Sequence, residues 1–134
     1  MPPPEIAGRI RNALAGRADV RLAILFGSQA RGTARDDSDI DIAVDAPGVD
    51  LLDLAAMLMQ AFDCEVDVVP LDDPSIPLLE QLVRDGIVVH EAKPGVGALW
   101  RSRTLATLET DRPWFARLRN AWLKRVAERG FSRG

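Results

Sequence analysis

The strongest constraint on the fold is a strict alternation of polar and apolar residues over positions 38–44. Asp39, Asp41 and Ala43 fall on one side of this segment, and three aliphatic residues fall on the other. Side chains of a β-strand point alternately to the two faces of a sheet, so the pattern predicts a strand with one apolar face. Because aspartate is a poor strand former, two aspartates in one strand call for a reason beyond folding.

The remaining elements are expected to alternate between strands and helices. Short apolar or alternating runs predict three further strands, at residues 20–26, 64–71 and 87–91. Helical spacing, capping residues and composition predict helices over residues 5–17, 28–31, 50–62, 75–84, 98–108 and 111–130. This order predicts an α/β (α+β) fold in which a small mixed sheet is flanked by helices, with C-terminal helices at the end.

Two of these segments carry a more specific expectation. The helix at residues 50–62 is apolar nearly all round, which predicts that it is largely buried. It also lies in the crossover between the strands at 38–44 and 64–71. A crossover of this length predicts that those two strands are parallel and close together.

Charge is distributed unevenly along the 134 residues. Residues 1–97 carry 8 Lys/Arg against 17 Asp/Glu, a balance of −9, whereas residues 98–134 carry 9 against 3, a balance of +6. We therefore expect a domain over residues 1–97 and a C-terminal helical extension over residues 98–134, packed on that domain or on a partner. The alternative is that the basic residues only form a solvated helix face.

Composition also indicates the compartment. Cys64 is the single cysteine, so no internal disulfide can form, and a reducing environment is the simple interpretation. The N-terminal residues resemble no secretory signal, and no apolar stretch is long enough to span a membrane. We therefore expect a cytoplasmic protein that does not contact membranes.

Three aspartates could serve one reaction. Asp39 and Asp41 present adjacent carboxylates on one strand face, and Asp67 falls on the polar side of the neighbouring strand. Mg²⁺ usually takes one or two carboxylates together with waters and substrate phosphate, and two such ions can clamp a phosphoryl displacement. Asp67 is the natural third ligand or the acceptor of a proton from the attacking hydroxyl. The alternative is that all three side chains are merely exposed to solvent.

The turn before this strand is suited to phosphate. Gly27 permits close approach of the backbone to a phosphate group, and Ser28 with the amides of a short helix can hold that group. Arg31 adds a positive charge and a bidentate donor. Together with the aspartates, these residues predict an enzyme that handles a nucleoside triphosphate.

The two segments resemble a known signature. Residues 27–32 (GSQARG) followed by residues 38–41 (SDID) are similar to the signature of the DNA-polymerase-β-like nucleotidyltransferase superfamily. Residues 66–69 (VDVV) resemble the strand that carries the third carboxylate in that superfamily. The small size resembles its minimal nucleotidyltransferase (MNT) branch, whose members include the antitoxins of HEPN–MNT toxin–antitoxin pairs.

The resemblance implies a function and a set of roles. It implies Mg²⁺-dependent transfer of AMP from ATP to a hydroxyl, expected to be a tyrosine, of a cognate HEPN ribonuclease toxin, which is thereby neutralised in a hetero-oligomer. Residues 1–97 would be the nucleotidyltransferase domain. Carried over by position, the expected metal ligands are Asp39, Asp41 and Asp67, and the expected nucleotide-binding residues are Gly27, Ser28 and Arg31.

Two other functions remain open from the sequence. The first is an antitoxin that acts by binding alone, suggested by a last helix with Trp114, Leu118, Trp122 and Val126 at four-residue spacing. Packing of this row on the chain's own core is the competing interpretation. The second is a small-molecule nucleotidyltransferase of the aminoglycoside-modifying kind, which the absence of a substrate-binding second domain disfavours. Direct binding of nucleic acid is not expected, since no aromatic stacking platform is present.

Overall fold

The computed structural model describes residues 5–32, 39–72 and 74–129, and in the last helix it leaves out the side chains of residues 111–116, 118–120, 122–123 and 126–129. Four strands form one mixed sheet in the order β3-β2-β1-β4. Their bounds are Leu22–Phe26 (β1), Ile40–Asp45 (β2), Val66–Pro70 (β3) and Ile87–Glu91 (β4). Strand β1 is antiparallel to both β2 and β4, whereas β2 and β3 are parallel. The predicted parallel pair is therefore confirmed.

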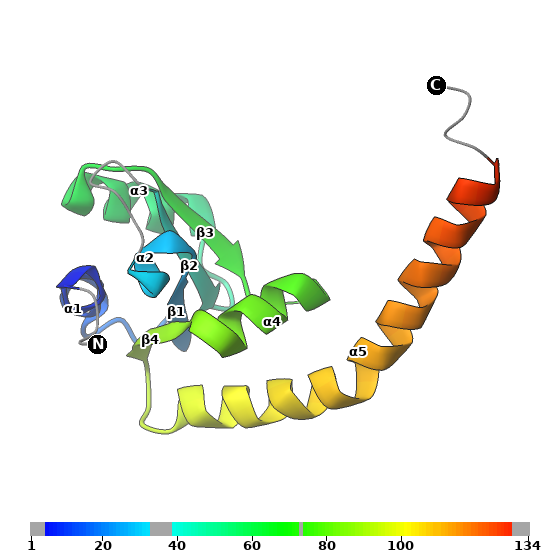
Figure 1. Cartoon of the computed structure of the whole chain (residues 1–134). Helices are drawn as coiled ribbons and strands as arrows, with labels where there is room; N and C mark the ends of the chain where they lie inside the picture. The colour runs from blue at the N-terminus through cyan, green and yellow to red at the C-terminus, as the bar shows by residue number, and fades with distance from the viewer. Residues whose placement is uncertain (1–4, 33–38, 73, 130–134) are drawn as a thin grey trace.

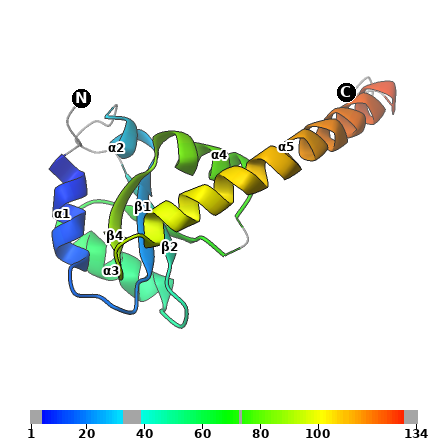
Figure 2. The same ribbon diagram turned by 90° about the horizontal axis from the view of Figure 1, so that it is seen from below.

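Helices cover both faces of the sheet (Figure 1). The helices are Glu5–Leu14 (α1), Ser28–Arg31 (α2), Leu51–Phe62 (α3), Ile76–Asp85 (α4) and Val96–Arg129 (α5). Helices α1 and α3 cover one face, and α4 with the first part of α5 covers the other, as the view from below also shows (Figure 2). The expected α/β fold, with a mixed sheet between helices, is thus present.

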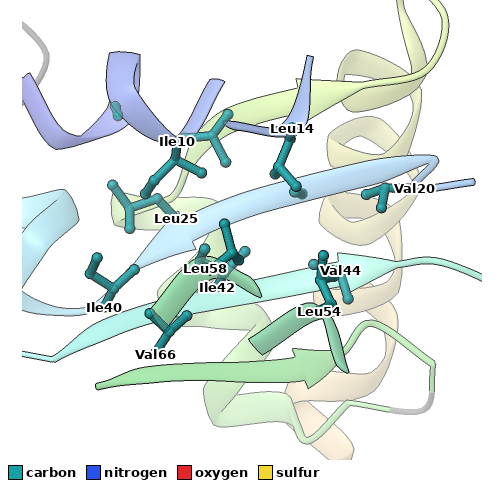
Figure 3. Packing of buried hydrophobic residues seen from close by; sticks show 13 residues of the cluster. Ile10, Leu14, Val20, Leu25, Ile40, Ile42, Val44, Leu54, Leu58 and Val66 are labelled. Carbon is teal, nitrogen blue, oxygen red and sulfur yellow. The ribbon is translucent and has the colours of Figure 1, made fainter. Parts of the chain in front are cut away.

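The main core lies between the sheet and the pair α1/α3 (Figure 3). The apolar side of the alternating segment faces this core, since Ile40, Ile42 and Val44 of β2 are at most 2% exposed. Ala43, the next residue of the other parity, is buried in a second cluster on the opposite face. The alternation therefore predicted correctly which side chains of β2 lie on each face of the sheet. Asp41 lies on the face that α4 and α5 cover.

Helix α3 differs from its prediction. We expected it to be largely buried, but this is wrong: Leu52 is 82% exposed and Met59 is also exposed. Only the side with Leu54, Ala55 and Leu58 is buried against the sheet. The sheet can bury only one side of α3, and no other described element covers the outer side of this helix. Helix α3 therefore carries more apolar side chains than it buries.

The C-terminal region also differs from its prediction. We expected two helices, divided near Asp111 and Pro113, but residues 96–129 form one helix, α5. Figure 1 shows that α5 changes direction partway along its length and that its second half projects from the body. Proline removes one backbone hydrogen bond from a helix interior and commonly bends a helix, but α5 continues through Pro113 and does not end there. Within the described residues, no helix is long and apolar enough to cross a membrane.

Candidate active site

Two of the predicted site residues face each other across neighbouring strands. Asp41 of β2 is in register with Asp67 of the parallel strand β3. On its other side, Asp41 is in register with Phe26 of the antiparallel strand β1. The three side chains therefore form a row across one face of the sheet, the face shared with Ala43. Asp41 is partly buried and Asp67 is exposed, so the row opens to solvent on the β3 side.

A glycine turn lies directly against Asp41. Gly27 follows β1 and caps α2 with φ 76° and ψ −157°, a backbone conformation that is essentially restricted to glycine. A Cβ atom at this position would lie 2.5 Å from Oδ2 of Asp41. Both the backbone conformation and the close approach explain why glycine occupies position 27, and they hold the turn beside the carboxylate.

The short helix α2 presents the two remaining predicted ligands. Ser28 is its first residue and is partly exposed, and Arg31 is its last residue and is exposed. Two turn bonds stabilise this helix: the Arg31 amide donates to the carbonyl of Gly27 at 3.1 Å, and the Gly32 amide donates to that of Ser28. The positive charge of Arg31 is close enough to Asp41 to oppose part of the rise in the pKa of that carboxyl. Serine, arginine and the carboxylate row therefore share one edge of the sheet.

Asp39 lies at the same edge but outside the strand. We expected a strand from residue 38, whereas β2 begins at Ile40 and Asp39 is an exposed residue just before it. The Ile40 amide donates to the carbonyl of Glu65 at 2.9 Å, which anchors this entry to the start of β3. Residues 33–38, which connect α2 to Asp39, lie outside the described residues.

Among the residues that the structure describes, the negative charges near Asp41 outweigh the positive charge that opposes them. The pKa of Asp41 is raised, first by burial of the carboxyl and then by the negative charges of Asp67 and Asp39, while Arg31 opposes the effect. A carboxylate that is partly desolvated and repelled by two others favours a bound cation or a proton. This electrostatic situation is typical of functional sites.

The donor set suits Mg²⁺ better than an ion held by protein alone. Among the described residues, no three His, Cys, Asp or Glu side chains are close enough to hold a metal ion together. Asp41 and Asp67 nevertheless present carboxylates on one face in register. Because Mg²⁺ usually retains waters and takes substrate phosphates beside one or two carboxylates, this pair fits a Mg–nucleotide site.

The structure also contains a cavity that the sequence did not indicate. It has a volume of about 570 Å³ and lies at the opposite end of β2 and β3. Its lining includes Asp45, Asp72 and Trp100, from three separate segments of the chain. The spacing of these residues in the sequence does not predict this cavity, because its lining depends on how α5 crosses the sheet.

Comparison with known proteins assigns the chain to a family. Residues 9–94, more than half of the chain, match the family described as "Polymerase beta, Nucleotidyltransferase". The chain belongs to this family, which confirms the superfamily predicted from residues 27–41. The matched range contains every predicted site residue.

The chain is also similar to individual proteins of known activity or structure. Over 73 residues the chain is 44% identical to the protein adenylyltransferase MntA of Shewanella oneidensis. The aligned region covers 50% of this chain and 51% of that protein. The alignment therefore spans about half the length of this curated relative. A solved toxin–antitoxin structure with AMP-PNP superposes with a TM-score of 0.67 and 29% identity, over 87% of this chain and 98% of the other. A complex of a tri-AMPylated Shewanella oneidensis HEPN toxin with MNT antitoxin superposes with a TM-score of 0.58 and 26% identity, over 88% of this chain and 93% of the other.

Proposed function

We propose that this chain is an MNT-type antitoxin that transfers AMP from ATP to a hydroxyl, expected to be a tyrosine, of a cognate HEPN toxin. The modification neutralises the toxin, and the two proteins form a hetero-oligomer in the cytoplasm. The family assignment, the 44% identity to a protein adenylyltransferase and the superposition on toxin–antitoxin structures support this proposal. Residues 1–97 carry the transfer reaction, and residues 98–134 form the extension.

The observation that carries the proposal is the close approach of the Gly27 turn to Asp41, a residue that is in register with Asp67. It combines a backbone that admits a phosphate group with carboxylates that need a cation. Bound Mg²⁺ would neutralise the triphosphate and polarise the phosphorus that is attacked. Asp39 and Asp41 are proposed as its ligands.

The other residues act on the nucleotide and on the acceptor. Asp67, on the exposed side of the row, is proposed as a third ligand or as the acceptor of the hydroxyl proton. Ser28 and the Gly27 turn hold a phosphate group, and Arg31 offsets part of its charge. The acceptor oxygen forms a bond to the α-phosphorus while the bond from that phosphorus to the bridging oxygen of the pyrophosphate breaks, so pyrophosphate is released and the hydroxyl proton passes to Asp67.

A label-transfer assay tests the proposal directly. The protein is incubated with ATP labelled at the α-phosphate, Mg²⁺ and the purified protein encoded by the adjacent gene. We expect label on that protein with the wild type and none with Asp41→Asn. Asp45→Asn is the matched control, since Asp45 ends the same strand away from the Gly27 turn and its side chain forms an exposed ion pair with Arg21 at 3.5 Å. Absence of label on a folded partner would refute the proposal.

One observation favours a second candidate, an antitoxin that neutralises by contact alone. The second half of α5 projects from the body and offers a surface for a partner (Figure 2). The two functions are separated by the double variant Asp39→Asn/Asp41→Asn in a toxicity assay. If this variant binds the toxin but no longer neutralises it, binding alone is insufficient and the second candidate is excluded.

A further inference from the structure

Strand β3 forms one edge of the sheet. It pairs with β2 on one side, and no other strand of the described residues pairs with it on the other side (Figure 3). At the start of β3, the carbonyl of Glu65 accepts a hydrogen bond from the Ile40 amide. After its end, the Leu71 amide donates to the carbonyl of Val44. Because the backbone groups of successive strand residues point to opposite sides, odd-numbered residues here bond to β2 and even-numbered residues face the open edge.

The open edge of β3 offers a short hydrogen-bonding ladder. By this alternation, the amides and carbonyls of Val66 and Val68 face outward. Pro70 is also even-numbered, and a residue without an amide proton is tolerated in an edge strand at such an outward position. The side chain of Val66 is only 4% exposed, and that of Val68 packs against the main core. The edge can therefore accept another strand through backbone groups alone.

The other edge of the sheet, at β4, is partly covered by its own chain. Helix α1 packs beside β4, and Nη2 of Arg11 donates to the carbonyl of Val88 at 3.2 Å. Near the end of β4, the Gly97 amide donates to Oε1 of Glu91 at 2.9 Å, which ties the start of α5 to this strand. Side chains and helices that cover an edge hinder the addition of a further strand. Of the two edges, β3 is thus the one that a partner can extend.

A strand added at β3 would extend the row of site residues. Phe26, Asp41 and Asp67 lie in register across β1, β2 and β3. A residue opposite Asp67 on the open edge would be the fourth member of this row, with its side chain on the same face of the sheet. In an antiparallel addition, Val66 and Val68 form the hydrogen-bonded pairs. Asp67 then takes the non-hydrogen-bonded position, where opposing side chains are closest.

We propose that the open edge of β3 binds an extended segment of the acceptor protein as a fifth strand, with the acceptor hydroxyl on the residue opposite Asp67. That the partner is modified on a hydroxyl rests on the proposed function. Asp67 would take the hydroxyl proton as the oxygen bonds to the α-phosphorus and pyrophosphate leaves. Neighbouring strands lie about 4.8 Å apart, so Asp41 is about 10 Å from the added strand. A long side chain such as tyrosine spans more of this distance than serine or threonine does.

The charge at this edge favours the acceptor segment over a second copy of this chain. Two copies of β3 paired antiparallel and centred on Asp67 would place their Asp67 side chains opposite each other. Like charges directly opposite destabilise a sheet, and Asp41 adds a further negative charge in the same row. A neutral hydroxyl side chain at the same position meets no such repulsion. The edge is therefore suited to a substrate segment and poorly suited to self-association.

Amide hydrogen exchange tests the proposal on the wild-type protein. Exchange is measured residue by residue by NMR in AMP-PNP and Mg²⁺, with and without the purified protein encoded by the adjacent gene. We expect exchange of the Val66 and Val68 amides to slow by about 10-fold or more in the complex. The amides of Asp67 and Val69 face β2 and serve as internal controls, whose exchange should change less than about 3-fold. A complex in which the Val66 and Val68 amides stay unprotected would overturn the proposal.

A proline substitution tests the same edge by kinetics. Val68→Pro removes the outward amide, and Val68→Ala is the matched control because it alters the side chain but keeps the amide. We expect Val68→Pro to raise KM for the acceptor protein by about 10-fold, since a carbonyl of the partner loses its donor, and Val68→Ala to change KM less than about 3-fold. The value of kcat at saturation and the binding of AMP-PNP should stay unchanged in both. Equal KM values for the two variants would contradict the proposal; if Val68→Pro does not fold, the exchange measurement decides.

These measurements also separate strand addition from the proposed function. If AMP is transferred while the Val66 and Val68 amides stay unprotected in the complex, strand addition fails and the proposed function stands. If no AMP is transferred but the partner protects both amides, the proposed function fails and the edge stands as the binding site of the partner. Protection that appears in the protein alone as its concentration rises would assign the edge to a second copy and overturn the proposal.

Discussion

The backbone of Gly27 lies against the carboxylate of Asp41, and no space is left between them for a side chain at residue 27. A Cβ atom at residue 27 would lie 2.5 Å from Oδ2 of Asp41. Gly27 also has φ 76°, which adds a conformational reason for glycine. The turn after β1 therefore depends on the position of the Asp41 carboxylate in β2, and a change at one should be detected at the other.

Gly27→Ala should therefore impair both stability and transfer. The strained backbone costs roughly 1–3 kcal/mol of the free energy of unfolding. Displacement of the Asp41 carboxylate should lower AMP transfer by about 10-fold or more. Gly16→Ala is the control, because Gly16 has φ 82° but no atom within 4 Å of its Cβ position. It should lose stability and retain transfer; equal loss of transfer in both variants would show that the contact with Asp41 is irrelevant.

Asp41→Asn should stabilise the metal-free protein at neutral pH. The raised pKa of Asp41 shows that burial and two neighbouring carboxylates oppose its charge. Replacing it with a neutral isostere removes this cost, and after allowance for solvent screening the gain is about 0.5 kcal/mol. The corresponding rise in Tm is about 2 °C and is measured by thermal denaturation in EDTA. Asp45→Asn at the other end of β2 should give no gain, and transfer should fall by roughly 100-fold or more only in Asp41→Asn.

The stabilisation by Asp41→Asn should depend on pH in a defined direction. The pKa of Asp41 is higher in the folded than in the unfolded chain, so the folded state binds its proton more tightly. Below its ordinary pKa, Asp41 is protonated in both states and its charge does not destabilise the folded protein. Above the raised pKa, Asp41 is charged in the folded protein and the full destabilisation is present. The difference in Tm between variant and wild type should therefore be largest near pH 7 and shrink as the pH falls towards 4. A difference that grows on acidification would contradict the assigned cause.

Nucleotide binding should require Mg²⁺. Asp39, Asp41 and Asp67 repel a triphosphate unless a cation lies between them, and Arg31 is the one cation that lowers the pKa of Asp41 within the described residues. AMP-PNP with Mg²⁺ at 100 times Kd should add about 2.7 kcal/mol to the free energy of unfolding. AMP-PNP with EDTA should add almost none. A shift in Tm that survives chelation would show that the carboxylates do not bind nucleotide through a metal.

Much of the candidate site could be predicted from the amino-acid sequence. The alternation at residues 38–44 determined which side chains of β2 enter the core, because the two-residue period of a strand leaves no other arrangement for Ile40, Ile42 and Val44. Motif spacing singled out Gly27 and Asp41, and the parallel arrangement of β2 and β3 followed from the helical crossover between them. These are local or nearest-neighbour properties, which a linear pattern can encode.

The register and the outer surfaces were decided only in three dimensions. No sequence pattern states that Asp41 lies opposite both Asp67 and Phe26, because register depends on how three strands align. The exposed side of α3 depends on the sheet offering a single surface to that helix. Packing against α4 stabilises the first half of α5 independently of local propensity, and the sequence did not show that this helix runs on through Pro113. Local chemistry was therefore readable from the chain, whereas the neighbours of each group were set by long-range packing.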